Sequence, residues 1–499
     1  MNATLSFFFR TLPVIYLSIL IGLLATRGQD APPNIILFLV DDQGWTGTSV
    51  RMDKNDPRSR SDFYETPALE RLAAQGMRFS QAYSPHPNCS STRMSIQTGK
   101  SPARIGTTDI YDVNPGTPGF IQPFYEMFYL NKPLIMHLPI VGLPENEITI
   151  AEFVKRHNPE YVFGHFGKWH MGPKDPSVHG YDWSDGPTTN KEGNLETEDP
   201  KEIYTVTEKA VRFLQRQSAR KTPFFLQVSH YAVHTAIQAK PETMGKYRTA
   251  TSGERHTNAG YGAMTEDLDD SLRILMEALD ELNLTDNTYV FYTSDNGGEV
   301  QDGSSPTNNI PLRKGKTHTW EGGIRVPFIA RGPGIAPDSQ SDAPINGSDL
   351  FATFADLTGI DASLPDNQDG GSLAGLLKRG GEGDVERGVD HFVWYYPHYR
   401  NMKDVFPQAS IRYGDYKLRK EYDTNTIMLF DLSKDLGESK DLSPTKPDLA
   451  AQLHKRLNDY LADIGAKVPA KNSNYDPKLD KGLNNRTFFN RAPQGNSRN

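Results

Sequence analysis

The sequence predicts an α/β protein: one large, mostly parallel β-sheet flanked by helices, joined to a small C-terminal α+β subdomain. Three observations support this prediction. Segments with the apolar spacing of helices alternate with short apolar runs, which is typical of a parallel sheet. The first run, residues 34–40, is almost entirely apolar, as expected for a strand buried on both faces. After residue 380 the pattern changes to short strands separated by turns, which favours an antiparallel sheet.

The elements of the large domain follow in order along the chain. A helix is expected after Thr66-Pro67, because threonine is a capping residue and proline fits the first turn, and Gly76 ends it. The other helices are expected over residues 148–157, 203–215, 264–279 and 348–358, and the other strands over residues 77–83, 161–166, 224–229 and 288–293.

The C-terminal part begins after a Gly-rich stretch at residues 378–384. Three short strands are expected over residues 409–413, 416–420 and 427–432, and a helix over residues 447–462. The predicted division is therefore a large domain at 29–380 and a sheet, a helix and a tail at 385–499.

Residues 1–28 are expected to form a signal peptide. Arg10 precedes an apolar run at residues 12–24, and small residues follow it. A membrane anchor is the alternative, but the run is short for a span of about 20 residues. We therefore expect a secreted or periplasmic protein without stable membrane insertion after cleavage. Cys89 is the only cysteine, so it cannot form an internal disulfide and needs another explanation.

Composition argues against a nucleic-acid partner. The 499-residue chain has a net charge of -8, and its isoelectric point lies near 5.9. No basic surplus is available to neutralise a phosphate backbone.

Carboxylate and amide side chains follow two of the predicted strands. Asp41 and Asp42 come directly after the strand at 34–40, and Asp295 and Asn296 follow the strand at 288–293. Ligands of parallel sheets gather beyond the carboxyl ends of the strands. Oxygen donors suit Ca²⁺ or Mg²⁺. The pattern therefore predicts one divalent metal site, with turn capping by these residues as the alternative.

A short segment around the single cysteine resembles a known signature. Cys89 precedes Arg93 by four positions, and Thr98-Gly99 follows. This resembles the signature of the formylglycine-dependent, arylsulfatase-like sulfatase family. Further segments that resemble this family follow in the same order, at residues 164–170, 230–234 and 312–327. The family has the alkaline-phosphatase fold, so the resemblance implies that architecture here.

The resemblance implies a modified nucleophile beside a metal ion. A formylglycine-generating enzyme would oxidise Cys89 to formylglycine during maturation. The ligands that the resemblance implies for one calcium ion are Asp41, Asp42, Asp295, Asn296 and the converted Cys89. Ser91 stands where the signature usually has proline, which bears on how efficiently a modifying enzyme processes the site.

The resemblance also implies a set of cationic and titratable residues. Arg93 and Lys168 would hold the formylglycine, and His170 would contact its hydroxyl. His234 and Lys316 would hold the sulfate ester, and His234 would protonate the leaving alcohol. Cations are needed because a sulfate ester is negatively charged and develops further charge as it reacts. In an extended chain, Lys168 and His170 would point to the same side.

Two other functions fit the same motifs. One is a phosphodiesterase or phosphonate monoester hydrolase of the same superfamily, and the other is a non-catalytic protein that binds sulfated glycans. For a sulfatase, export favours a sulfated carbohydrate as substrate. The aromatic stretches at residues 110–144 and 394–399 are candidates for a sugar subsite, although aromatic residues at this density are commonly part of a core.

Overall fold

The computed structural model describes residues 31–110 and 131–480, apart from residues 136, 138, 141, 196, 197, 301–304, 401–404 and 479. The predicted signal peptide and most of the aromatic stretch at 110–144 lie outside the described residues. From Pro33 onward the described residues form one compact unit. Within them, no helix has both the length and the apolar character needed to cross a bilayer.

The large sheet has eight strands in the order β10-β2-β9-β8-β1-β7-β5-β6. Strand β9 runs antiparallel to both of its neighbours, and the other neighbouring strands are parallel. This confirms the predicted mostly parallel sheet. The strands are β1 (Asn34–Val40), β2 (Met77–Phe79), β5 (Val162–Gly167), β6 (Trp183–Ser184), β7 (Phe224–Ser229), β8 (Thr288–Ser294), β9 (Phe328–Arg331) and β10 (Ser339–Ser341).

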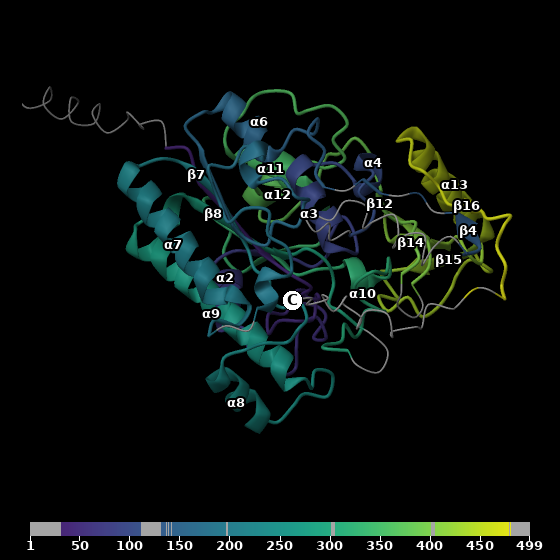
Figure 1. Ribbon diagram of the computed structural model, residues 1–499, viewed down its shortest axis with the longest axis horizontal. Helices are drawn as coiled ribbons and strands as arrows, with labels where there is room; N and C mark the ends of the chain where they lie inside the picture. The colour runs from purple at the N-terminus through teal and green to yellow at the C-terminus, as the bar shows by residue number, and fades with distance from the viewer. Residues whose placement is uncertain are drawn as a thin grey trace, which may run out of the picture. The chain divides into compact units, whose positions relative to one another are not determined.

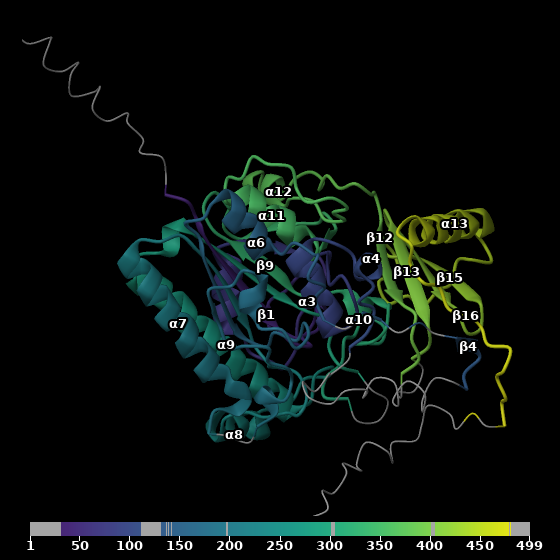
Figure 2. The same ribbon diagram turned by 45° about the horizontal axis from the view of Figure 1, so that its top comes forward.

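Helices cover both faces of this sheet, as Figures 1 and 2 show. Alternate residues of β1 enter two separate apolar cores, because successive side chains of a strand point to opposite faces. One core contains α2 (Pro67–Ala74), α7 (Ile203–Arg220) and α9 (Ala259–Glu281). The other contains α3 (Cys89–Thr98), α6 (Ile150–His157), α11 (Asp349–Leu357) and α12 (Ala374–Lys378).

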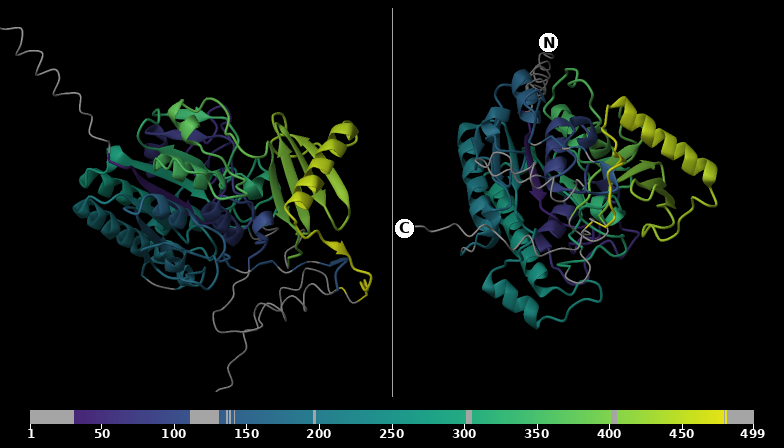
Figure 3. Two further views of the ribbon diagram at one scale, coloured as in Figure 1. Left: turned by 90° about the horizontal axis from the view of Figure 1, so that it is seen from above. Right: turned by 45° about the vertical axis from the view of Figure 1, so that its right-hand side comes forward.

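The predicted C-terminal subdomain is also present. Its sheet is antiparallel in the order β12-β13-β14-β15, with strands at Phe392–Tyr396, Gln408–Tyr413, Tyr416–Glu421 and Thr426–Asp431. Helix α13 (Pro447–Asp463) packs on this sheet through Leu453, Leu457 and Leu461 (Figure 3).

Shorter elements complete the described chain. The helices are α4 (Pro102–Ile105), α8 (Pro241–Thr249) and α10 (Glu321–Ile324), with single 3-10 turns at Pro176–His179, Glu192–Asn194, Pro200–Glu202 and Thr285–Asn287. The two-stranded sheets pair β3 (Ala82–Tyr83) with β11 (Ile345–Asn346), and β4 (Leu134–Ile135) with β16 (Ala470–Lys471).

The single strand predicted over residues 77–83 is wrong. The chain forms β2 and β3 in two different sheets, with a break at Ser80-Gln81. At the break the guanidinium of Arg325 donates to the Ser80 carbonyl, with Nε at 3.1 Å and Nη2 at 2.6 Å. The Arg325 side chain therefore takes the place of a neighbouring strand as the hydrogen-bond partner of the Ser80 carbonyl.

A buried group of charges links β14 of the C-terminal sheet to α10 of the large domain. Lys417 Nζ, on β14, lies 2.9 Å from Glu321 Oε1 and 2.9 Å from Glu438 Oε1, and all three side chains are fully buried. Glu321 Oε2 also accepts from the Tyr83 hydroxyl at 2.8 Å and lies 3.3 Å from Arg325 Nη1. Removing one partner of a buried ion pair leaves the other charge buried and unpaired, which is costly. Glu321 and Arg325, which belong to the segment at residues 312–327, therefore have a structural role.

Candidate active site

The acidic residues at the two strand ends lie together because β1 and β8 are parallel neighbours. Their register aligns Val40 with Ser294, so the residues that follow both strands share one edge of the sheet. The Asp42 backbone amide donates to Asp295 Oδ1 at 3.2 Å, and the Asn296 side-chain amide donates to Asp42 Oδ1 at 2.7 Å.

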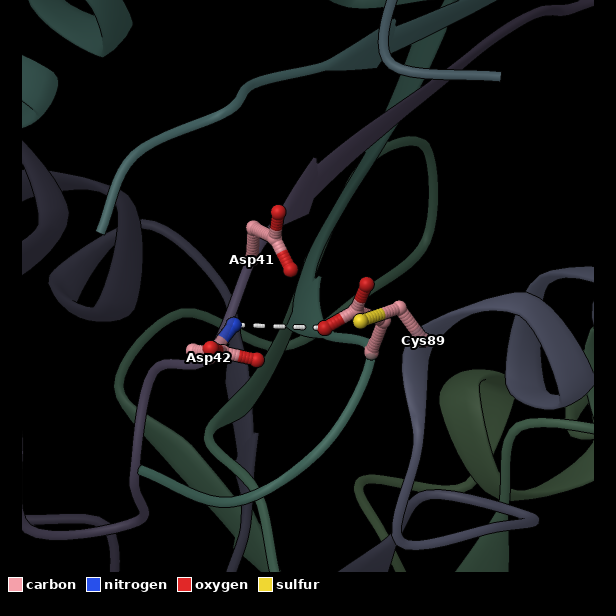
Figure 4. A group of neighbouring side chains, drawn as sticks. Asp41, Asp42 and Cys89 are labelled. Atoms are coloured by element: carbon pink, nitrogen blue, oxygen red, sulfur yellow. Dashed lines mark hydrogen bonds between the residues drawn. The ribbon is translucent and has the colours of Figure 1, made fainter. Parts of the chain in front are cut away.

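Cys89 reaches this edge from the first turn of α3. It is the first residue of the helix and is fully buried. Ligand atoms of Asp41, Asp42, Cys89 and Asp295 all lie within 4.8 Å of one another. Figure 4 shows Asp41 and Asp42, which follow β1, close to Cys89, which comes from α3.

The end of α3 explains the Thr-Gly pair of the signature. Thr98 Oγ1 bonds to the Met94 carbonyl at 2.9 Å, and Gly99 ends the helix with φ 69. A Cβ at position 99 would lie 1.9 Å from Gln368 Oε1, so the site requires glycine.

Each carboxylate of the group is paired with a buried cation. The three pairs are Lys168 Nζ to Asp41 Oδ2 at 2.6 Å, Lys316 Nζ to Asp42 Oδ2 at 2.7 Å, and Arg93 to Asp295 Oδ2 at 2.9 Å from Nε and 2.7 Å from Nη2. Three negative and three positive charges therefore cancel within this group. A divalent cation would make it positive and suited to an anionic substrate.

The cations keep Asp41 and Asp42 ionised. Burial is the largest single effect on Asp41 and would raise its pKa, but the charges of Lys168, His234 and Arg93 together outweigh burial, and the pKa falls to about 2. For Asp42 the charges of Lys316, His234 and Lys168 together likewise outweigh burial and lower the pKa. The thiol of Cys89 behaves oppositely, because burial raises its pKa to about 12 despite Lys168 and Lys316. The thiol is therefore protonated at neutral pH.

Two buried oxygens in the group point to a cation. Asp41 Oδ1 and Asn296 Oδ1 are buried and have no hydrogen-bond partner. An unpartnered buried acceptor is costly, and a hard cation would satisfy both. The residues therefore fit the calcium ion that the resemblance implies.

His234 lies beside this group, just past the end of β7. Its Nδ1 is 2.5 Å from the Thr235 carbonyl, which can only accept, so Nδ1 carries a proton. Nε2 lies 3.7 Å from Asp42 Oδ2 and 3.4 Å from the Asn190 side-chain nitrogen. Burial, together with the charge of Lys316, lowers the pKa of His234. Its side chain keeps 18% exposure, so it is the site residue most open to a substrate.

The extended-chain argument for Lys168 and His170 is wrong. Strand β5 ends at Gly167, and His170 has φ 53, so the residues do not alternate as in a strand. The Lys168 amide still donates to the Ser229 carbonyl of β7 at 2.8 Å, but Gly167 has φ 89, and beyond it the His170 amide donates to the Thr188 carbonyl at 2.8 Å, outside the sheet. The catalytic role of His170 stays a prediction.

The aromatic stretch at 394–399 does not offer rings for a sugar. Trp394, Tyr395, Tyr396 and Tyr399 are all buried, and the Trp394 indole donates to the Ser84 carbonyl at 2.8 Å. These side chains pack the subdomain against the large domain instead.

Two residues near the site were missed in the sequence analysis. Asn190 contacts His234, and Lys201 is buried close enough to Asp41 and Asp42 for their charges to affect its pKa. Both lie between β6 and α7, in a segment without a recognisable motif, so only the three-dimensional arrangement reveals them.

Known proteins are similar to this chain in both sequence and fold. The sulfatase family model matches residues 33–360, and a model described as N-sulphoglucosamine sulphohydrolase, C-terminal matches residues 315–463. A sulfatase of Formosa agariphila is 27% identical over 87% of this chain and 90% of its own length. The mouse N-acetylgalactosamine-6-sulfatase is 32% identical over 75% of this chain and 71% of its own length. The crystal structure of Ps i-CgsB has a TM-score of 0.69 at 25% identity, covering 87% of this chain and 93% of that chain.

The fold and the sequence matches together define the class of the protein. The chain belongs to the sulfatase family. It is a sulfuric ester hydrolase, as the names of its relatives indicate.

Proposed function

We propose that this chain hydrolyses sulfate monoesters of a carbohydrate, with a formylglycine derived from Cys89 as nucleophile and one calcium ion. The observation that carries the proposal is the buried group around Cys89. It combines three carboxylates, three cations and two unpartnered oxygens at one edge of the sheet.

Asp41, Asp42, Asp295 and Asn296 would hold the calcium ion together with the converted Cys89. When bound, the ion would withdraw charge from the sulfate oxygens. Asp41 and Asp42 are ionised, and Asp41 and Asn296 each have a buried oxygen to offer. These are the oxygen donors that calcium prefers.

Hydrated formylglycine supplies two hydroxyls on one carbon, one to attack sulfur and one to allow release of sulfate. The thiol is a poor substitute, because it is buried and protonated at neutral pH. Position 89 also lies at the N-terminus of α3, where the helix dipole favours negative charge on an oxygen.

The remaining residues would bind the substrate and move one proton. Lys168 and Lys316 are close enough to Cys89 for their charges to affect the pKa of its thiol. They would offset the negative charge that develops on the sulfate. His234 would act as an imidazolium, with one proton on Nδ1 fixed on the Thr235 carbonyl and a second on Nε2 that passes to the leaving alcohol. The charges of Asp42 and Asp41 favour this form, and the negative charge of a bound sulfate ester would offset the opposing effects of burial and Lys316.

The proposed substrate class and the proposed export of the protein rest on further observations. Several relatives are N-acetylgalactosamine-6-sulfatases, and Ps i-CgsB has been crystallised with k-i-k-neocarrahexaose, at a TM-score of 0.69. A sulfated carbohydrate is therefore the proposed substrate of this chain as well. The apolar run at residues 12–24 supports export by a signal peptide and maturation by a formylglycine-generating enzyme on that route.

The function is tested with a panel of esters and protein purified with the aldehyde in place. We expect turnover of sulfated mono- and oligosaccharides and of nitrophenyl sulfate, at rates well above those for aryl phosphate diesters. Faster hydrolysis of the phosphate diesters would favour the phosphodiesterase alternative. Binding of sulfated sugars without any turnover would contradict the proposal.

The role of His234 predicts an effect that depends on the leaving group. A sugar alcohol needs a proton as it leaves, whereas nitrophenolate does not. We expect His234→Ala to lower kcat on a sugar sulfate by about 10²-fold or more, and kcat on nitrophenyl sulfate far less. Initial rates on both esters give the comparison. Equal losses on both would show that His234 binds the sulfate without protonating the leaving group.

A further inference from the structure

Lys201 differs from the other buried cations near the site. Its residue exposure is only 1%. Lys168, Lys316 and Arg93 each pair with a carboxylate. Among the described residues no carboxylate forms an ion pair with Lys201. Its ammonium donates instead to the neutral Asn194 Oδ1 at 2.6 Å.

A buried ammonium with a neutral partner is costly to the fold. Burial lowers the pKa of Lys201 to about 8, against an opposing effect of Asp41. The backbone there is also strained, with φ 59 at Lys201 and φ 50 at Glu202. An apolar side chain would avoid the cost of burying the charge. An anionic ligand that binds the ammonium would offset this cost.

The segment that carries Lys201 also contacts residues of the candidate site. The described residues of the segment 186–202 contact both His170 and His234. The Thr188 carbonyl accepts from the His170 amide at 2.8 Å, and Asn190 lies 3.4 Å from His234 Nε2. Farther along, Gly193 packs so closely on Tyr231 that a Cβ there would lie 2.3 Å from the Tyr231 Cβ. The same segment then ends at Lys201, within the field of Asp41, Lys168 and Asp42.

We infer that Lys201 is a specificity-determining residue that binds a second anionic group of the substrate beside the sulfate ester that is hydrolysed. The inference rests on the proposed function. The second group is a carboxylate or another sulfate, since either accepts from an ammonium. The substrate is then a doubly anionic sugar unit, such as a disulfated sugar or a sulfated sugar joined to a uronic acid.

The test compares three substrates: a hexose monosulfate, the corresponding disulfate, and the same monosulfate linked to a uronic acid. With aldehyde-bearing enzyme, we expect a lower KM for at least one doubly anionic substrate than for the monosulfate. Lys201→Met should raise the KM for that substrate by about 10-fold to 100-fold, with a much smaller effect on the monosulfate and on kcat. Lys201→Arg should keep the preference. The substrate that loses affinity identifies the second group.

Two further variants separate recognition from structure. Lys221 is exposed at the other end of α7 and has a similar backbone, φ 53, so Lys221→Met should leave the KM values unchanged. Asn194→Asp would give Lys201 an internal carboxylate and should also weaken the preference.

Three results would overturn the inference. One is an equal loss on all three substrates with Lys201→Met, which would mean that Lys201 only holds the segment through Asn194. The second is that the parent enzyme shows no preference for a doubly anionic substrate over the monosulfate. The third is that Asn194→Asp leaves that preference unchanged. Failure to hydrolyse any sulfate ester would count against the proposed function instead.

Discussion

Replacing Cys89 by alanine is expected to lower sulfatase activity by about 10⁴-fold or more, because the variant cannot form the nucleophile. The fold should survive, since Cys89 has no disulfide and alanine removes only one buried atom. Mass spectrometry of the peptide that spans residue 89 should show the aldehyde in active enzyme. Its mass is lower than that of the thiol peptide by the difference between H₂S and oxygen.

Serine at position 89 provides the matched control. It preserves the size of the side chain, but it becomes a formylglycine only in a host with a serine-type modifying enzyme. Cys89→Ser should therefore be inactive in other hosts, while its calcium-dependent stability stays close to that of the parent. The proposal would have to be abandoned if protein with a fully unmodified thiol turned over sulfate esters at an undiminished rate.

The long apolar elements could be predicted from the sequence because one physical effect dominates each of them. The strand over residues 34–40 matches β1 at both ends, since a run buried on both faces needs no information from distant residues. The helix predicted over 148–157 ends at the same residue as α6 but begins two residues too early, because Thr149 forms a capping box with Glu152 and the helix starts after it. The proximity of the two acidic pairs could be predicted because they follow parallel strands, and β1 and β8 are neighbours that end at the same edge of the sheet.

Where distant contacts decide the outcome, local patterns fail. Residues 77–83 have the pattern of a strand, yet the Arg325 guanidinium binds the carbonyl at the break between β2 and β3. Helix α3 was not predicted, because most of its ten residues are polar although all of them are buried, so the sequence shows no apolar stripe. Lys201 could not be found either, since its position near the site depends on a turn against Tyr231.

Charge balance connects these observations to the reaction. The ion pairs with Lys168 and Lys316 help to keep Asp41 and Asp42 ionised, so both carboxylates can accept a metal cation. A carboxylate oxygen that already binds a lysine or an arginine must then either bind the metal as well or give up its bond to that side chain. Loss of one carboxylate therefore affects both a metal ligand and the partner of a buried cation. The effects on metal binding and on stability have to be measured separately.

Asp295→Asn is expected to lower kcat/KM by more than about 100-fold, because it removes a charged metal ligand. It also leaves Arg93, which is fully buried, without the charge of its partner. Some loss of stability is therefore expected in addition, up to about 3–5 kcal/mol for a broken buried pair. The measurement is the unfolding temperature after chelation, with and without added calcium, together with activity.

Asp349→Asn is the matched control that separates metal binding from loss of an ion pair. Asp349, the first residue of α11, is fully buried and accepts from Arg387 Nε at 2.7 Å and Nη2 at 2.6 Å, as Asp295 accepts from Arg93. Its carboxylate also accepts from the Asn346 backbone amide, and it is not part of the group around Cys89. It should lose stability yet keep the calcium response, which amounts to about 2.7 kcal/mol when calcium is present at 100 times its Kd. Asp295→Asn should lose that response. Full activity of chelated, metal-free protein, or an undiminished calcium response in Asp295→Asn, would exclude this group as the catalytic metal site.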